Sequence, residues 1–593
     1  MDDITTTTET VPQTKSLLKK ITDKLEWAGL KVRAEKCRSL VIVKGKVQRR
    51  ELKINGKAIT QLQDKYIKYL GKEYRADLSE QEQISVVGSN LKQDLTKIDR
   101  CKLPGKYKSW ILQYMLLPRL MWPLTVYNVP MTKIEDFQRQ ITNLIKKWMG
   151  IPKNLSNSCL YSKTSRLRLP FTSLTEEYRA TKARNLVTFQ HSSDPCIREA
   201  RIKVDGGRKL NTPLEVEEAK SRLKMQEIIG IPNIGREGLG TRSTMLYSKC
   251  SSKSKRDLIV KTLRVKEEEK RVVNMTMLSK QGSHLKWEVP QRRISKEDLT
   301  SVAEEKLRFL IKSVYDLLPT PANKNKWFNT DEHCLLCGEN ATLNHILSGC
   351  KVALSQGRYK WRHDKVLYEL ATGIQAKISE GGSTHTVNRN VPFVREGMAE
   401  KASMAGSPSR VYRRGCATGP APKTQSGFTH RGSDKGPSPS LGPVLPSPQP
   451  YLASANDWKL TVDLADRLKI PKEVMETDLR PDITITSQDT KQMAIIELTV
   501  PSEERIEISG ELKRMKYEVV VTEGKKSGWK VRCWAVEVGC RGFPAASMSR
   551  LLKDLGFTGK ERRKRIQKLA STAEDASRSI WKASHFKTWG KCW

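Results

Sequence analysis

The sequence predicts a multidomain α+β protein, and three observations support this fold class. The chain has 593 residues, a length that suggests about three to five domains. Residues from about 80 to 310 show mainly helical periodicity. After Asp457, strand and helix signals alternate, as expected for a small α/β domain. A compact Cys/His module and a stretch rich in Pro, Gly and Ser lie between these two parts.

The N-terminal part is expected to begin with a helix over residues 12–29, in which apolar residues recur at spacings of three and four. Two short strands are expected at 39–43 and 51–54. An apolar stripe between Trp110 and Leu120 ends near two prolines and indicates a further helix.

The C-terminal part is expected to contain strands at 481–486, 493–500 and 529–538, with a helix at 503–520. In this helix Ile508, Leu512, Met515 and Val519 form one apolar face, and Ile506 with Val520 form a second face that carries Lys513 and Tyr517. We therefore expect the helix to be buried on both sides.

The stretch before this part is expected to be a disordered tether. Residues 401–450 contain 9 Pro, 7 Gly and 8 Ser, and such a segment has few apolar groups to bury. The end of the chain carries a basic run from Lys560 to Arg565.

Charge is the first indication of function. The chain has 107 Lys and Arg against 65 Asp and Glu, a formal net charge of +42. Such an excess favours a polyanionic partner, usually nucleic acid; the alternative is a basic protein whose lysines are simply solvated.

Several classes of protein are excluded by pattern. No apolar run of about 18 residues predicts a membrane span, and the first residues do not resemble a secretory signal. The 12 cysteines are too sparse for a disulfide scaffold. We expect a cytosolic or nuclear protein with no membrane partner and no small-molecule substrate.

The most specific motif is a Cys-x2-Cys-x7-His-x4-Cys pattern formed by Cys334, Cys337, His345 and Cys350. Three thiolates and one imidazole suit a tetrahedral structural Zn²⁺ ion with no open coordination position. The alternative is three buried cysteines and an incidental histidine. His333 and His363 flank the module and are competing candidates as ligands.

Two pairs of acidic residues suggest a second metal chemistry. Asp482 and Glu497, near the ends of two predicted strands, are candidates to bind Mg²⁺ for phosphodiester cleavage, with Lys513 and Tyr517 on one face of the following helix. Asp2 and Asp3 resemble the paired aspartates of nucleotide polymerases. By spacing alone both pairs are weak signals, since isolated acidic residues are common.

Together these blocks resemble the C-terminal part of the polyprotein of non-LTR (LINE-type) retrotransposons that carry a restriction-like endonuclease. Met1-Asp2-Asp3 resembles the end of the reverse-transcriptase (F/Y)MDD motif. The other similar blocks, in chain order, are AGLKVRAEKCRSL from Ala28, KYLG from Lys68, QYMLLPRLMWPL from Gln113, LPTPANKNKW from Leu318, the Cys-Cys-His-Cys zinc knuckle, GRYKWRHDKVL from Gly357, RPDITI from Arg480, IIELTVP from Ile495, KRMKY from Lys513 and VEVGCRGF from Val536.

The resemblance implies seven regions. These are a remnant of the reverse-transcriptase palm at 1–75, a thumb-like helical region at 76–190, a mainly helical linker at 191–319, the zinc knuckle module at 320–375, the tether at 376–456, a restriction-like endonuclease domain at 457–560 and a basic tail at 561–593.

The resemblance also implies residue roles. Asp482 and Glu497 would bind Mg²⁺, while Lys513 and Tyr517 would complete the endonuclease site. Lys516 remains an alternative to Lys513. Arg480 is a candidate to contact a phosphate or to support Asp482.

The partners implied are a DNA target site and the element's RNA, with action in the nucleus and a ribonucleoprotein in the cytoplasm as a second location. We expect no RNA copying by this chain alone, because no palm aspartate or fingers precede Met1 in it. Two functions remain open: a metal-dependent DNA endonuclease with a nucleic-acid-binding knuckle, and a catalytically inactive remnant that only binds nucleic acid.

Overall fold

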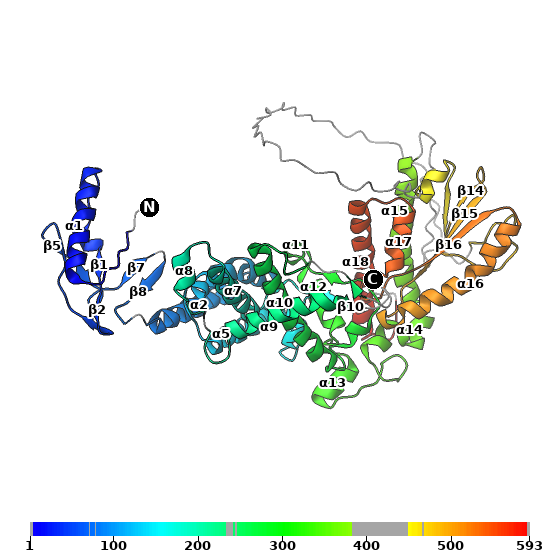
Figure 1. The fold of residues 1–593 in the computed structure, drawn as a ribbon. Helices are drawn as coiled ribbons and strands as arrows, with labels where there is room; N and C mark the ends of the chain where they lie inside the picture. The colour runs from blue at the N-terminus through cyan, green and yellow to red at the C-terminus, as the bar shows by residue number, and fades with distance from the viewer. Residues whose placement is uncertain are drawn as a thin grey trace, which may run out of the picture.

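The computed structural model describes residues 4–69, 71–77, 79–204, 206–232, 241–242, 246–381, 449–464 and 468–589. Figure 1 shows a small N-terminal part, a helical middle part and a C-terminal part built on a sheet. The fold is mixed α/β with more helix than strand, which confirms the predicted class at this level. Asp2 and Asp3 lie outside the described residues.

The N-terminal part combines one helix with short strands. Helix α1 (Val11–Trp27) begins at the expected position, where the side chains of Thr10 and Gln13 form a capping box. The strands that follow it are β1 (Arg38–Ser39), β2 (Val41–Val43), β3 (Lys46–Gln48), β4 (Lys53–Ile54), β5 (Lys57–Ala58), β6 (Thr60–Gln61), β7 (Ile67–Tyr69) and β8 (Lys72–Tyr74). They form two-stranded pairs only: β1 with β6 in parallel, and three antiparallel hairpins.

Two of these hairpins turn through residues with positive φ. Lys44 and Gly45 join β2 to β3, and Asn55 and Gly56 join β4 to β5; all four have φ between +49° and +78°. Two successive positive φ angles define the type I′ turn, whose twist matches that of the strands it joins. The predicted strands at 39–43 and 51–54 are therefore present as parts of tight hairpins and of the β1–β6 pair.

The middle part is helical, as expected. Its helices are α2 (Gln81–Arg100), α3 (Gly105–Ile111), α4 (Leu117–Val126), α5 (Met131–Trp148), α6 (Asn157–Tyr161), α7 (Leu174–Gln190), α8 (Pro195–Glu199), α9 (Thr212–Ile229), α10 (Ser252–Thr276), α11 (Lys296–Ser301), α12 (Glu304–Val314) and α13 (Pro321–Phe328). Two strand pairs accompany them: parallel β9 (Leu167–Arg168) and β12 (Arg292–Arg293), and antiparallel β10 (Ile231–Pro232) and β11 (Thr241–Arg242). Among the residues that the structure describes, no helix is long and apolar enough to cross a bilayer.

One hydrophobic core joins the middle part to the C-terminal part. Ile134, Ile141 and Ile145, on one face of α5, are completely buried in it. The same core includes Trp287 and, from the C-terminal part, Phe543, whose rings meet edge to face at 5.4 Å. The two parts therefore pack against each other through apolar side chains.

The C-terminal part contains a four-stranded sheet in the order β13-β14-β15-β16. The strands are β13 (Lys459–Val462), β14 (Ile483–Ser487), β15 (Gln492–Thr499) and β16 (Lys530–Glu537), and the helices are α14 (Lys351–Ser355), α15 (Arg358–Gly381), α16 (Ile506–Lys526), α17 (Ala546–Asp554) and α18 (Gly559–Ala583). Strands β13, β14 and β15 are antiparallel neighbours, whereas β15 and β16 are parallel. Parallel neighbours need a crossover connection, and α16 provides it.

Helices cover both faces of this sheet. Side chains of α15, α17 and α18 form one core with Ile485, Ile496 and Val536. On the opposite face, Tyr517 and Val520 of α16 form a second core with strand residues. Figure 1 shows α15 and α18 on one side of the sheet and α16 on the other. Strand β15, QMAIIELT in sequence, is buried along its length except at its two end residues, because both of its faces are covered.

Glycines let α16 approach the sheet closely. A Cβ atom on Gly510 would lie 2.3 Å from Oε1 of Glu537, and one on Gly524 would lie 2.4 Å from Cγ2 of Val531. Both contacts are too short for a side chain to be added without a shift. These two glycines therefore set the distance between α16 and β16.

The sheet unit extends beyond the 457–560 range predicted from sequence. Helix α15 begins before the predicted tether (376–456) and continues into it as far as Gly381, so the prediction of disorder is wrong for 376–381. Helix α18 occupies most of the predicted basic tail, with Leu569 and Ala573 completely buried. Tyr451, also outside that range, packs on Trp458 and Trp534. Most of the predicted tether, residues 382–448, lies outside the described residues. Segments from both sides of it thus share one core.

Replacing Leu367 by Ala tests the role of α15 in this core. Leu367 is completely buried against the sheet, and a large-to-small change at such a site typically costs about 2–5 kcal/mol. We expect faster amide hydrogen exchange in β14 and β15 of the full chain. Leu512→Ala, at a site 64% exposed on α16, should change the exchange little. Equal exchange in the two variants would contradict the packing of α15 on the sheet.

Candidate metal centre and active site

The four expected zinc ligands come together in the structure. The ligand atoms of Cys334, Cys337, His345 and Cys350 all lie within 4.8 Å of one another. The Sγ atoms of Cys334 and Cys350 are 4.0 Å apart, and Cys337 Sγ lies 3.2 Å from His345 Nε2. Tetrahedral Zn²⁺ with Zn–S bonds of about 2.3 Å separates two sulfurs by about 3.8 Å. Both the donor set and its spacing therefore suit zinc.

Local backbone geometry explains how this cluster forms. Gly338, with φ of +75°, closes the turn after the first two cysteines, and its N–H donates to the Cys334 carbonyl at 2.8 Å. A π-helical turn over His345–Gly349 then leads to Cys350, the N-cap of α14. His345 Nδ1 lies 3.6 Å from Glu339 Oε2, so the carboxylate orients the ring with Nε2 toward the cysteines.

The two competing histidines lie elsewhere. The His333 side chain is 59% exposed, and its Nδ1 contacts Asp331 Oδ1 at 2.5 Å. His363 is on α15, where its Nδ1 contacts Asp364 Oδ1 at 3.0 Å. With four ligands and no open position, the cluster suits a structural ion rather than a catalytic one.

The second site lies where β14 begins beside β15. Ile483 pairs with Ile496, which places Asp482, just before β14, next to Glu497. The N–H of Asp482 donates to Glu497 Oε1 at 3.1 Å, and the N–H of Leu498 donates to Asp482 Oδ2 at 2.7 Å. The sheet register therefore brings the two carboxylates to one place, as the sequence predicts.

Lys513 reaches these carboxylates from α16. Its Nζ lies 2.5 Å from Glu497 Oε2 and 4.0 Å from Asp482 Oδ2. Lys516, the alternative lysine, is exposed and lies over the ring of Tyr517. The structure thus brings Lys513, and not Lys516, to the acidic pair.

Tyr517 and Arg480 meet through the backbone. The Tyr517 hydroxyl donates to the Arg480 carbonyl at 2.6 Å, and its ring is completely buried. Tyr517 therefore fixes the backbone that leads into Asp482 and β14. The Arg480 side chain is exposed, two residues before Asp482.

The expectation that α16 is buried on both sides is wrong. Ile508, Leu512, Met515 and Val519 are 54–69% exposed, while Ile506, Tyr517 and Val520 are buried. Apolar periodicity marks a face that can pack, but it does not show which face the rest of the chain covers. Lys513 points inward because it lies beside the buried face, with 28% of its side chain exposed.

His363 is a site residue that sequence reasoning assigned only as a competing zinc ligand. Its Nε2 lies 3.2 Å from the Leu498 carbonyl oxygen and 3.5 Å from Asp482 Oδ2. The Asp482 carboxylate, just before β14, and the Leu498 carbonyl, on β15, therefore both face His363 Nε2. His363 and Leu498 are 135 residues apart, so no local spacing pattern could indicate this contact.

The charges in the site are interdependent. Burial raises the pKa of Glu497, and the Asp482 charge raises it further against the opposing effect of Lys513. Burial also opposes ionisation of Asp482, but the hydrogen bond and charge of His363, followed by the charge of Lys513, hold its pKa below the usual range. Burial disfavours the charged form of His363, yet Asp364 and Asp482 raise its pKa to about 9. Asp482 is thus the more strongly ionised carboxylate, with two cationic neighbours.

The start of α15 connects the zinc cluster to this site. The Tyr359 hydroxyl donates to the carbonyls of His345 and Ile346, while the Cys350 N–H donates to the same hydroxyl. One turn later, buried Arg362 donates to the Leu347 carbonyl at 2.8 Å and to the Val500 carbonyl at 3.0 Å. His363 follows directly, so one helical turn spans both sites.

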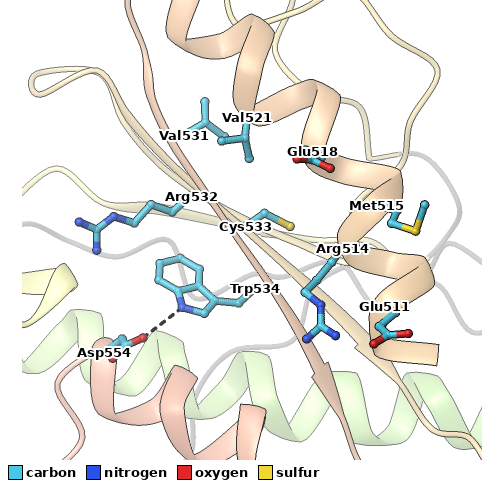
Figure 2. A pocket seen from close by; sticks show the side chains of 10 residues that line it. All are labelled: Glu511, Arg514, Met515, Glu518, Val521, Val531, Arg532, Cys533, Trp534 and Asp554. Atoms are coloured by element: carbon cyan, nitrogen blue, oxygen red, sulfur yellow. Dashed lines mark hydrogen bonds between the residues drawn. The ribbon is translucent and has the colours of Figure 1, made fainter. Parts of the chain in front are cut away.

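A separate groove of about 660 Å³ lies between α16 and β16, the edge strand of the sheet (Figure 2). Its charged lining residues are of both signs: Arg514 and Arg532 against Glu511, Glu518 and Asp554. Trp534 Nε1 donates to Asp554 Oδ2 at 3.2 Å within it. Neither Asp482 nor Glu497 lines the groove, and its mixed charge does not favour a phosphate, so it is not part of the candidate active site.

Comparisons with known proteins do not assign a family. No protein-family model matches the chain, and no curated protein matches it significantly. The assignment of roles therefore depends on the geometry above and on the motif resemblance.

Removing zinc should loosen the start of α15. Cys334→Ser replaces one thiolate ligand with a poor one, and a structural zinc site contributes its binding energy to local folding. We expect loss of zinc from the purified full chain by elemental analysis, with faster hydrogen exchange at 350–363. Cys196→Ser, at an exposed cysteine on α8, is the matched control and should retain zinc. Full zinc content in both variants would contradict the assignment.

Proposed function

We propose that the chain acts as a metal-dependent DNA endonuclease with a structural zinc knuckle, and that it belongs to the polyprotein of a non-LTR retrotransposon. One observation carries the proposal. Asp482, Glu497 and Lys513 come from two strands and a helix, and Lys513 Nζ lies within 4.0 Å of both carboxylates. Two acids and a lysine in this arrangement suit phosphodiester cleavage.

Oxygen donors for a divalent ion lie at this point, where the ion would take the place that His363 Nε2 holds beside Asp482 Oδ2 and the Leu498 carbonyl oxygen. Asp482, Glu497 and the Leu498 carbonyl would hold Mg²⁺, which prefers oxygen ligands. When bound, the ion would lower the pKa of a water and stabilise negative charge on the leaving oxygen. This role in the proposal follows from ligand chemistry and from the motif resemblance.

The chain's own cations have distinct tasks in this proposal. Lys513 places a positive charge next to the attacked phosphate, where it stabilises the charge that develops in the transition state. Asp482 is held in position by the Leu498 N–H and by His363. Tyr517 fixes the backbone before Asp482 and acts as a positioning residue.

The proposed partners are a DNA target site and the element's RNA, with action in the nucleus. The net charge of +42 supports a polyanionic partner. Basic side chains are also available on the sheet unit, since Lys560, Arg563, Lys564 and Lys568 are exposed on α18. A chain that binds DNA without cutting it would instead be the inactive remnant.

Two lysines on α16 provide a matched test of the endonuclease. Lys513→Ala removes the ammonium group beside both carboxylates, and loss of one such electrostatic contact typically lowers a rate about 10²–10³-fold. Lys516→Ala removes an exposed lysine three residues away and should leave the rate nearly unchanged. The measurement is nicking of supercoiled plasmid by the full chain with Mg²⁺. No nicking by the unchanged chain, or equal rates for the two variants, would contradict the proposal.

Binding to DNA should depend strongly on salt. If six phosphates are contacted, neutralisation releases enough counterions to weaken binding about 10³-fold between 50 mM and 200 mM salt. Filter binding of a duplex over this range measures the slope. An affinity that hardly changes would indicate that the positive charge serves another partner.

A further inference from the structure

Helix α13 ends in two adjacent aromatic side chains that are open to solvent. Phe328 is 72% exposed and Trp327 is 39% exposed. Their rings meet edge to face, with centroids 6.3 Å apart and planes at 86°. Among the described residues, they are the only two large exposed aromatic residues adjacent in sequence. Figure 1 shows α13 at the lower margin of the molecule, apart from the sheet.

The helix that presents these rings is firmly anchored. Thr320 caps its start by accepting from the Asn323 N–H at 3.0 Å, and Ala322 and Asn323 are buried. The Ala322 N–H donates to the Ala341 carbonyl of the zinc knuckle at 3.4 Å. At the other end, Asn329 takes a left-handed conformation with φ of +53° and ends the helix directly after Phe328. The exposed rings are therefore held by a rigid support.

Three lysines lie on α13 or beside it. Lys324 and Lys326 are exposed on the same helix, and Lys280, in the turn after α10, donates to Asn323 Oδ1 at 2.8 Å. The nearby Lys280 ammonium lowers the pKa of Lys326. Lys280 Nζ also lies 3.4 Å from Asp316 Oδ2, which offsets part of the repulsion between the two ammonium groups, and a phosphate beside Lys326 would offset more of it.

We propose that Trp327 and Phe328 form a stacking platform for unpaired bases of single-stranded nucleic acid, with Lys280, Lys324 and Lys326 contacting its phosphates. Aromatic rings bind bases of any sequence by stacking, while neighbouring lysines follow the backbone. A protein surface that bound only duplex phosphates would need the lysines but not the rings. The inference rests on the proposed function in one respect, since it takes nucleic acid as the partner.

The test separates stacking from charge. Three probes of about 16 units are compared by fluorescence anisotropy: oligo(dT), oligo(U) and an abasic deoxyribose-phosphate oligomer. The protein is the full chain with Asp482→Asn, so that the probes are not cut. Trp327→Ala and Phe328→Ala should each weaken binding to oligo(dT) or oligo(U) about 5- to 100-fold, and should not change binding to the abasic probe. The stronger of the two oligonucleotides identifies DNA or RNA as the source of the strand.

Removing a lysine should weaken binding to the abasic probe as well, unlike removing an aromatic ring. Lys326→Ala should weaken binding to all three probes and reduce the slope of log affinity against log salt by about 0.7, the value for one phosphate contact on a single strand. Trp27→Ala removes a lone indole that is 86% exposed on α1, and it should leave all three affinities unchanged.

Two results would overturn the inference: no loss in either aromatic variant, or an equal loss on the abasic probe. No loss in either aromatic variant would indicate that the rings contact a protein partner instead. Failure of the proposed function is distinguishable, because it would appear as binding without plasmid nicking in the chain that retains Asp482. Zinc content, measured for every variant, verifies that the knuckle beside α13 is folded.

Discussion

Arg362 is a buried cation whose guanidinium group joins three segments that lie far apart in the chain. Its N–H groups donate to the carbonyls of Leu347 and Val500 and to the hydroxyl of Ser577. These acceptors belong to the zinc knuckle, to the end of β15 and to α18. A buried carbonyl left without its donor costs about 1–3 kcal/mol, so each segment depends on the position of this side chain. The placement of His363, the next residue, follows from the same constraint.

The proposed activity requires a carboxylate, Glu497, inside the hydrophobic sheet, where a charge lowers stability. Its side chain is completely buried in a strand whose other buried residues are apolar, and burial of a carboxylate is expensive unless it is paired. Lys513 and the Asp482 N–H supply the partners. Replacing a buried ion pair by apolar residues is often neutral or stabilising. We therefore propose that this charge lies inside the sheet for the chemistry proposed above rather than for stability.

The predictions from sequence succeeded where the determinants were local. The four residues of the Cys/His cluster lie within 17 residues, and hard constraints on ligand type and spacing made them recognisable as a site that suits zinc. Asp482 and Glu497 were weak signals by spacing, and the motif resemblance singled them out. His363 could not be found in this way, because its contacts cross 135 residues. The exposed side of α16 was predicted wrongly because tertiary packing, not periodicity, decides which apolar face is covered.

The distance along the chain between α15 and its sheet also affects how the protein is made. During synthesis at about 5–20 residues per second, roughly 7 to 27 s separate the appearance of His363 from that of Leu498, 135 residues later. For that time Leu367 and Leu370, on the apolar face of α15, have no sheet to pack against. Non-local contacts of this kind slow folding and leave apolar surface open to aggregation. The zinc cluster is complete at Cys350, before this interval begins, so a nascent chain that has bound metal already holds the first turn of α15 in place.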